Sequence, residues 1–212
     1  MAREQQSPPE LRDPYAEMAQ LALSQQSAPG AETRCTLGGR WAAASVRCQW
    51  GAPGVLHLGI SGLIAPLSRD VSDEIRQADS TIVELDSLGG GLSASLEFYA
   101  ALSSRPGGCT VRARHACSGG LIVLLAGSRR LMYSGGQAMW HRVIDILSGN
   151  ATQLRIAADE VEKIEAGLVQ LFASRTGQPP SATKSWFGDR DCIFTPEAAL
   201  CAGLVHELLP AG

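Results

Sequence analysis

Ser118 is the residue best placed for nucleophilic chemistry in this chain of 212 residues. It lies in the segment HACSGGLIVLLAG, between a predicted strand and a predicted apolar helix, and Gly119 follows it. The positive end of a helix dipole favours an alkoxide or oxyanion there, and the Gly119 amide is a natural oxyanion-hole donor. Serine is also a preferred helix cap, and the segment taken alone favours that interpretation. The flanking residues do not form the GxSxG elbow of the α/β-hydrolases.

A second candidate element is the glycine-rich loop in VELDSLGGGLSAS, where Gly89–Gly91 separate a predicted strand from a predicted helix. Glycine permits positive φ and close backbone approach, so such a loop can point amide N–H groups at an oxygen anion. Taken alone, the loop favours a tight turn without a ligand. It is neither a Rossmann fingerprint nor a Walker loop, because the required spacing and the Lys-Ser/Thr ending are missing.

A serine nucleophile needs a base, and the base needs a group that orients it. The chain has four histidines. His141 follows the strand-like AMW at the start of a loop, where an imidazole could reach a neighbouring helix start. His57 and His115 alternate with apolar residues and are predicted to be structural, and His206 is close to the C-terminus. Asp191 lies in GDRDCIF and by itself indicates only a surface or turn aspartate.

The elements that must position these residues alternate between strand and helix from Val55 onwards. Strands are predicted at VLHLGI, TIVELDS, CTVRARHA, RRLMY and AMWHR, after a short strand pair around Arg40–Gln49. Helices are predicted at Ser68–Gln77, at Leu92–Ser103 and over LIVLLAG. This alternation predicts an α/β domain with a largely parallel sheet.

The longest predicted helix runs from Asn150 to Ser174. Its apolar residues recur at spacings of three and four and share one stripe: Leu154, Ala157, Val161, Ile164, Leu168 and Leu171. The remaining faces are charged, with Arg155, Asp159, Glu162, Lys163 and Glu165. The pattern predicts an amphipathic helix packed on its own domain, with a solvated charged face.

The composition limits which binding partners and which cellular location are expected. A net charge of −3 and a pI near 5.8 give no reason to expect nucleic acid or an anionic membrane. No segment approaches the ~20 apolar residues of a membrane span. The start MAREQQSPPE lacks the features of a secretory signal, so a cytoplasmic location is expected.

The six cysteines form no CxxC pair and have no histidine at zinc-finger spacing, so no metal is expected. In a reducing cytosol they are predicted to be small buried apolar residues. Residues 1–33 are rich in Gln, Ser, Pro and Ala and are predicted to be a flexible tail, followed by one domain over 34–212.

In their order and spacing, several segments between Val55 and Pro210 resemble the proteolytic subunit of the Clp protease. LDSLGGG resembles the family's Ser-Pro-Gly-Gly segment, and ACSGGLIVLLAG resembles its Ala-Ser-Met-Gly nucleophile helix. MWH is similar to Met-Ile-His, and SGNAT to Gly-Gln-Ala-Thr. RTGQP matches the end of the family's long helix, and DRDCIFTPEAALCAGLV its Arg-Asp segment and closing Glu-Ala…Gly-Leu signature.

The resemblance implies the ClpP/crotonase-like fold, with repeated β-β-α units and a protruding long helix. It implies that Ser118 is the nucleophile, His141 the general base and Asp191 the group that orients the imidazole. The amides of Gly90 and Gly119 become the oxyanion hole. The implied activity is that of a serine endopeptidase without a cofactor, which cleaves short peptides and unfolded polypeptides inside a heptameric or tetradecameric chamber. An AAA+ ATP-dependent unfoldase is a candidate partner.

The chain also departs from the family pattern. Leu88 stands where the family usually has proline, and Arg142-Val143 replace the usual Gln-Pro after the histidine. The stretch between VLHLGI and TIVELDS, which in the family helps to form the unfoldase docking sites, is shorter than usual. The N-terminal tail is longer. These departures suggest a divergent or phage-related member.

Other functions fit parts of the pattern. A crotonase-type acyl-CoA enzyme shares this fold and its oxyanion hole, but such enzymes generally act through Glu or Asp carboxylates. A catalytically inactive ring subunit is the second alternative, against which the complete Ser-His-Asp set argues. A Ser-Lys dyad is a third, although Lys163 falls on the polar face of the long helix and Lys184 in a loop.

Overall fold

The computed structural model describes residues 45–144 and 148–211. The tail expected at residues 1–33, the first part of the strand pair expected around Arg40–Gln49, and Cys35 lie outside the described residues. The elements follow in the order β1 (Ser45–Trp50), β2 (Val55–Ile64), α2 (Arg69–Gln77), β3 (Ser80–Gly90), α3 (Leu92–Ser103), β4 (Cys109–Cys117), α4 (Gly119–Ala126), β5 (Arg129–Trp140), α5 (Ala151–Thr176), α6 (Pro180–Lys184), β6 (Cys192–Phe194), α7 (Pro196–Cys201) and β7 (Glu207–Leu209).

The strands of the described residues form one seven-stranded sheet in the order β1-β2-β3-β4-β5-β6, with β7 also paired to β5. The pairs from β2 to β5 are parallel, whereas β1 and β6 add antiparallel edges. The predicted α/β fold with a largely parallel sheet is therefore confirmed. The two short strands predicted at RRLMY and AMWHR are one strand, β5, whose register against β4 shifts between Ala113 and His115.

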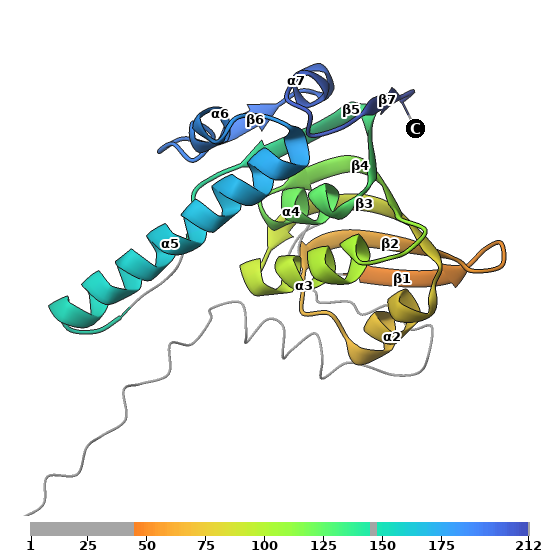
Figure 1. Ribbon diagram of the computed structural model, residues 1–212, viewed down its shortest axis with the longest axis horizontal. Coiled ribbons are helices and arrows are strands. Elements are labelled where there is room, and N and C mark those ends of the chain that lie inside the picture. Colours follow the sequence, from red (N-terminus) through yellow and green to blue (C-terminus); the bar gives the residue numbers. More distant parts are fainter. Residues whose placement is uncertain (1–44, 145–147, 212) are drawn as a thin grey trace, which may run out of the picture.

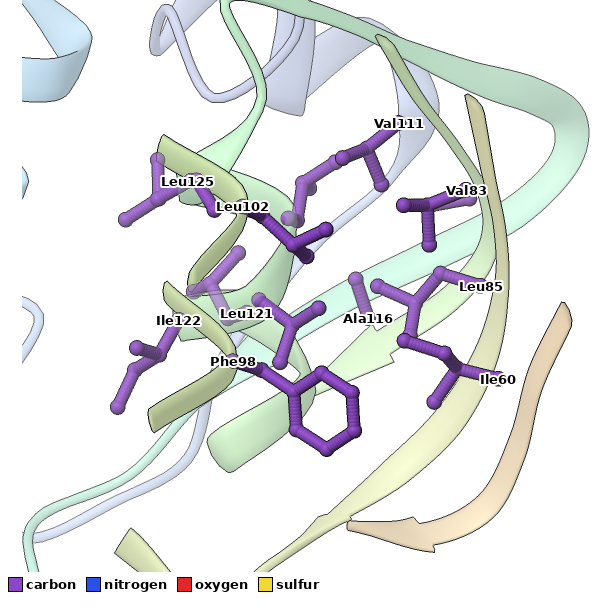
Figure 2. Close-up of a cluster of buried hydrophobic side chains, with 14 of the residues drawn as sticks. Ile60, Val83, Leu85, Phe98, Leu102, Val111, Ala116, Leu121, Ile122 and Leu125 are labelled. Carbon is purple, nitrogen blue, oxygen red and sulfur yellow. The ribbon is translucent and has the colours of Figure 1, made fainter. Parts of the chain in front are cut away.

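Helices connect the parallel strands, and α3 and α4 lie together over one face of the sheet (Figure 1). Every residue of α4 is buried, which explains why this helix is apolar on all sides. Figure 2 shows the core between the two layers, with Ile60, Val83 and Leu85 from the strands facing Phe98 and Leu121 from the helices. This packing fixes the start of α4, and with it Ser118, relative to the sheet.

Helix α5 begins with a capping box, in which Asn150 accepts the Gln153 N–H and the Gln153 side chain accepts the Asn150 N–H. It ends at Gly177 in the left-handed conformation. Its C-terminal half packs on the domain, where Leu168 and Phe172 are buried. The N-terminal half projects away from the sheet (Figure 1). Leu154 and Ile156 in this half, and Ile164 at the start of the second half, are exposed.

The prediction that the α5 stripe packs on its own domain is thus correct only for the second half of the helix. The physical reason is length, since 26 residues at about 1.5 Å each extend past the edge of the sheet. In the part of the chain that the structure describes, no helix is long and apolar enough to cross a membrane.

Candidate active site

Ser118 has an unusual backbone conformation, with φ 51° and ψ −123°. It is the only non-glycine residue with positive φ among the described residues. Its N–H donates to the carbonyl of Met139 at 2.8 Å, and its carbonyl accepts from Leu121 at 2.9 Å. Its side chain makes no capping hydrogen bond to α4. The hydroxyl is therefore not used as a helix cap, and the surrounding structure holds the residue in a conformation that costs about 1 to 3 kcal/mol.

Gly89 lies directly against the serine. A Cβ atom on Gly89 would meet the Ser118 Cβ at 2.6 Å, and the glycine itself has φ 121°. Its N–H donates to Ser87 Oγ, and the Ser87 hydroxyl donates to the Gly62 carbonyl at 2.5 Å. The glycine loop thus contacts the serine because no side chain intervenes. Sequence reasoning missed Ser87, whose only signal was its place at the end of a buried strand.

The two predicted oxyanion donors are neighbours. Gly90 ends β3, in register with Ile64, and a Cβ on Gly119 would lie 3.2 Å from the Gly90 carbonyl. The same Cβ would lie 2.3 Å from Ser95 Oγ, so position 119 accommodates only glycine without rearrangement. The Gly119 amide is the first of α4, a position whose N–H has no partner within its own helix.

His141 lies at the same edge of the sheet as Ser118. The parallel β4–β5 register pairs Cys117 with Met139, so both residues follow the carboxyl ends of adjacent strands. The imidazole stacks on Trp140, with ring centroids 6.2 Å apart and planes 13° apart. Its Nδ1 lies 2.5 Å from the Arg142 carbonyl.

Asp191 precedes β6 on the other side of β5. The antiparallel β5–β6 register pairs Trp140 with Cys192, so the next position places Asp191 opposite His141. Three adjacent strands therefore bring the three predicted residues to one region of the sheet edge. Within the described residues, however, the imidazole bonds to the Arg142 carbonyl and not to the exposed Asp191 carboxylate.

Arg142 makes an ion pair with Glu165 of α5. The Arg142 Nη2 lies 2.7 Å from Glu165 Oε2, and its Nε lies 3.1 Å from both carboxylate oxygens. The hydrogen bonds and the charge of Glu165 raise the pKa of Arg142. The helical pattern placed Glu165 on the solvated face, yet the residue is only 7% exposed. That prediction was wrong because the segment after His141 covers the carboxylate.

Two further titratable residues, His115 and Cys117, lie just before Ser118 in the sequence. Burial, and secondarily the charge of Asp86, raises the pKa of the Cys117 thiol to about 11, so this neighbour of Ser118 stays protonated near neutral pH. His115, predicted to be structural, places Nδ1 2.7 Å from Asp86 Oδ1 on the adjacent strand. Of the cysteines in the described residues, Cys109 and Cys117 are buried as predicted and Cys192 is partly buried. Cys48 and Cys201 are exposed, contrary to that prediction.

Comparison with known proteins adds independent findings. The family model described as Clp protease matches residues 71–211. A curated relative, the ATP-dependent Clp protease proteolytic subunit 2 of Thermobifida fusca (strain YX), is 30% identical over 142 residues, which cover 66% of this chain and 69% of the relative. The solved structure of a mutant of ClpP1 from Listeria monocytogenes matches with a TM-score of 0.64 at 21% identity. The match covers 73% of this chain and 91% of the ClpP1 chain. The likeness confirms the ClpP-type fold that the sequence predicted.

Proposed function

Since this chain belongs to the Clp protease family, we propose that it is a serine endopeptidase that cleaves short peptides and unfolded polypeptides. The observation that carries the proposal is the conformation of Ser118. A strained, non-capping serine lies at the N-terminus of a buried helix, one strand away from His141. Backbone strain of this kind concentrates at functional sites.

In the proposed mechanism, Ser118 Oγ attacks the scissile carbonyl while His141 Nε2 accepts its proton. The amides of Gly90 and Gly119 stabilise the oxyanion of the tetrahedral intermediate. The imidazolium then gives the proton to the amine of the cleaved peptide bond. The amine product departs, and the acyl group remains bound to Ser118 as an ester. His141 then deprotonates a water molecule that attacks this ester. The acyl group departs as a carboxylic acid, and Ser118 Oγ takes the proton from the imidazolium, which restores both residues.

Asp191 is the proposed orienting group of the triad, supported by its register position opposite His141. The Arg142 carbonyl supports the same tautomer. A carbonyl oxygen can only accept, so the His141 nitrogen that contacts it, Nδ1, must carry the hydrogen. In a neutral imidazole the lone pair then lies on Nε2, the atom required to act as base.

The proposal includes a ring-shaped homo-oligomer, a heptamer or a tetradecamer, that encloses the sites in a chamber. Support comes from family membership and from the exposed apolar side chains of α5, Leu154, Ile156 and Ile164. An AAA+ ATP-dependent unfoldase is the proposed partner for folded substrates, and the cytoplasm the proposed location.

The test of the nucleophile is labelling by a fluorophosphonate probe together with cleavage of a fluorogenic peptide. We expect the wild-type protein to be labelled and Ser118→Ala to lose both labelling and cleavage, with a rate loss of several orders of magnitude. Ser104→Ala is the matched control, because this exposed serine bonds to the Ala101 carbonyl and the Arg105 guanidinium and to no residue of the proposed site. Full activity of Ser118→Ala would contradict the assignment.

An inactive ring subunit is the alternative that one observation favours, namely the bond from His141 to Arg142 in place of Asp191. The same experiment decides between the two. A correctly assembled wild-type protein that neither reacts with the probe nor cleaves peptides would favour the inactive subunit.

A further inference from the structure

Glu165 of α5 is an unusual carboxylate because it is almost fully buried beside the segment that carries the proposed base. Its side chain is 10% exposed, whereas that of its partner Arg142 is 45% exposed. A buried carboxylate is costly unless it is paired and hydrogen-bonded. Glu165 meets this need with the Arg142 guanidinium, through bonds of 2.7 Å and 3.1 Å, and with a backbone N–H.

That backbone N–H belongs to Val143, whose nitrogen lies 3.0 Å from Glu165 Oε1. The Val143 nitrogen and the Arg142 carbonyl are parts of one peptide group, which is planar and rigid. The carbonyl end of this peptide lies 2.5 Å from His141 Nδ1. One carboxylate thus holds the N–H end of the peptide whose carbonyl end holds the imidazole.

The ion pair between Arg142 and Glu165 is a second contact that holds the segment after His141 against α5. Charge-assisted bonds from an arginine fork are directional, so they restrict the position of Arg142 relative to α5. Helix α5 is itself anchored below Glu165 by its buried residues Leu168 and Phe172. The contact therefore connects His141 to a rigid element of the fold.

We propose that Glu165 is a positioning residue for His141: through Arg142 and the 142–143 peptide it fixes the tautomer and the orientation of the imidazole that deprotonates Ser118. The inference rests on the proposed function and concerns the arrangement seen here, in which the Arg142 carbonyl, and not Asp191, accepts the single hydrogen of His141 Nδ1. Glu165 itself touches neither substrate nor the reacting atoms.

The variant Glu165→Gln tests the proposal in the full-length assembled protein, because it keeps the shape of the side chain and removes its charge. We expect every active site still to be labelled by the fluorophosphonate probe, but with a rate constant about ten- to a hundredfold lower. The KM for a short peptide should stay within about twofold of the wild-type value while kcat falls. Glu160→Gln is the matched control, since Glu160 pairs with Lys163 on the exposed face of the same helix.

The rate constant of labelling and the fraction of protein that is labelled distinguish a positioning role from a structural one. A merely structural role would reduce the fraction of labelled protein and leave the rate of the remaining sites unchanged, and this result would overturn the proposal. A wild-type rate in Glu165→Gln would overturn it as well. If that variant does not fold, Arg142→Lys takes its place: it keeps the charge but loses the fork, and a wild-type labelling rate would again refute the proposal.

The Ser118→Ala variant keeps the two proposals distinguishable. If Ser118→Ala still reacts like the wild type, the nucleophile assignment fails, and the role of Glu165 fails with it. If Ser118→Ala is unreactive and Glu165→Gln is unaffected, only the positioning role is wrong.

Discussion

At the scale of single residues, the geometry of the site depends on positions where the backbone conformation or a neighbouring atom excludes most side chains. Ser118 has a positive φ that non-glycine residues rarely adopt, and Gly89 must lack a Cβ for the loop to approach it. Gly119 is restricted in the same way by Ser95. These restrictions act together to place a hydroxyl and backbone amides around one point.

Gly89→Ala should therefore disable the site. The alanine Cβ would lie 2.6 Å from the Ser118 Cβ at a φ of 121°, so either the serine or the loop must move. We expect the rate of fluorophosphonate labelling to fall by at least about a hundredfold, and the free energy of unfolding to fall by about 1 to 3 kcal/mol. Labelling kinetics and denaturant unfolding measure the two effects.

Gly135→Ala provides the control for this substitution. Position 135 has no heavy atom within 4 Å of an added Cβ, and its φ is not in the left-handed region. The variant should match the wild type in labelling rate and in stability. Equal labelling rates for Gly89→Ala and Gly135→Ala would show that the Gly89 contact does not matter for the site.

At the scale of elements, the C-terminal segment holds the sheet through β5. The His206 N–H donates to the Arg130 carbonyl at 2.7 Å, and the Arg130 N–H donates back to His206 Nδ1 at 3.2 Å. Arg130 is buried and donates to the carbonyls of Gly127, Arg175, Gly203 and Leu204. This network joins the end of α4, the end of α5 and the approach to β7.

The stability of this network should depend on pH. Burial, followed by the charges of Arg130 and Arg175, lowers the pKa of His206 below its usual value of 6.5. The unfolded chain therefore binds a proton more readily than the folded one near that pH. By linkage, the free energy of unfolding should decrease as the pH falls through about 6.5. Protonation of Nδ1 would also remove its ability to accept the Arg130 N–H.

His206→Asn checks the origin of this pH dependence, because the Asn side-chain oxygen can accept the same N–H without titrating. We expect the melting temperature of the variant to fall less than that of the wild type between pH 7.5 and pH 5.5. Thermal melts at several pH values measure the difference. Parallel curves for the two proteins would contradict the role of His206.

At the scale of the whole molecule, α5 is the feature that a single chain does not explain. Its N-terminal half projects away from the sheet (Figure 1). Leu154 and Ile156 in this half, and Ile164 at the start of the next, are exposed. Leu154 and Ile164 belong to the apolar stripe of the helix, and an exposed apolar stripe is typical of protein–protein contacts. The same helix anchors Glu165, so a contact made by its outer half would act on an element that also supports His141.

Leu154→Lys should therefore weaken assembly without unfolding the chain, since Leu154 lies on the exposed part of the apolar stripe. We expect the wild type to have the native mass of seven or fourteen chains of 22.3 kDa, and the variant to form a smaller particle, because a lysine is costly to bury at an interface. Native mass spectrometry measures the particle, and far-UV circular dichroism checks the fold. Glu160→Gln is the control on the polar face of the helix. A wild type that is monomeric at micromolar concentration and still active would contradict the ring.

The sequence by itself determined the order and type of most elements. Alternating apolar runs and helical spacings predicted β4 and helices α2 and α3 to within one residue, because burial on a sheet or under a helix imposes a fixed period. The starts of β2 and β3 were predicted equally well, but these strands continue four and three residues beyond the predicted ends. The motif order also indicated the family and named Ser118, His141 and Asp191 as candidates.

Only the tertiary structure decided how these candidates relate. Strand register places Ser118, His141 and Asp191 at the ends of β4 and β5 and the start of β6, and no local pattern encodes register between segments so far apart. The burial of Glu165 could not be predicted either, because its position in the helical pattern is polar and the residues that cover it are 22 and 23 positions away. Periodicity determines which face of an element is apolar. Tertiary packing alone decides which polar side chain is buried and which atom it hydrogen-bonds.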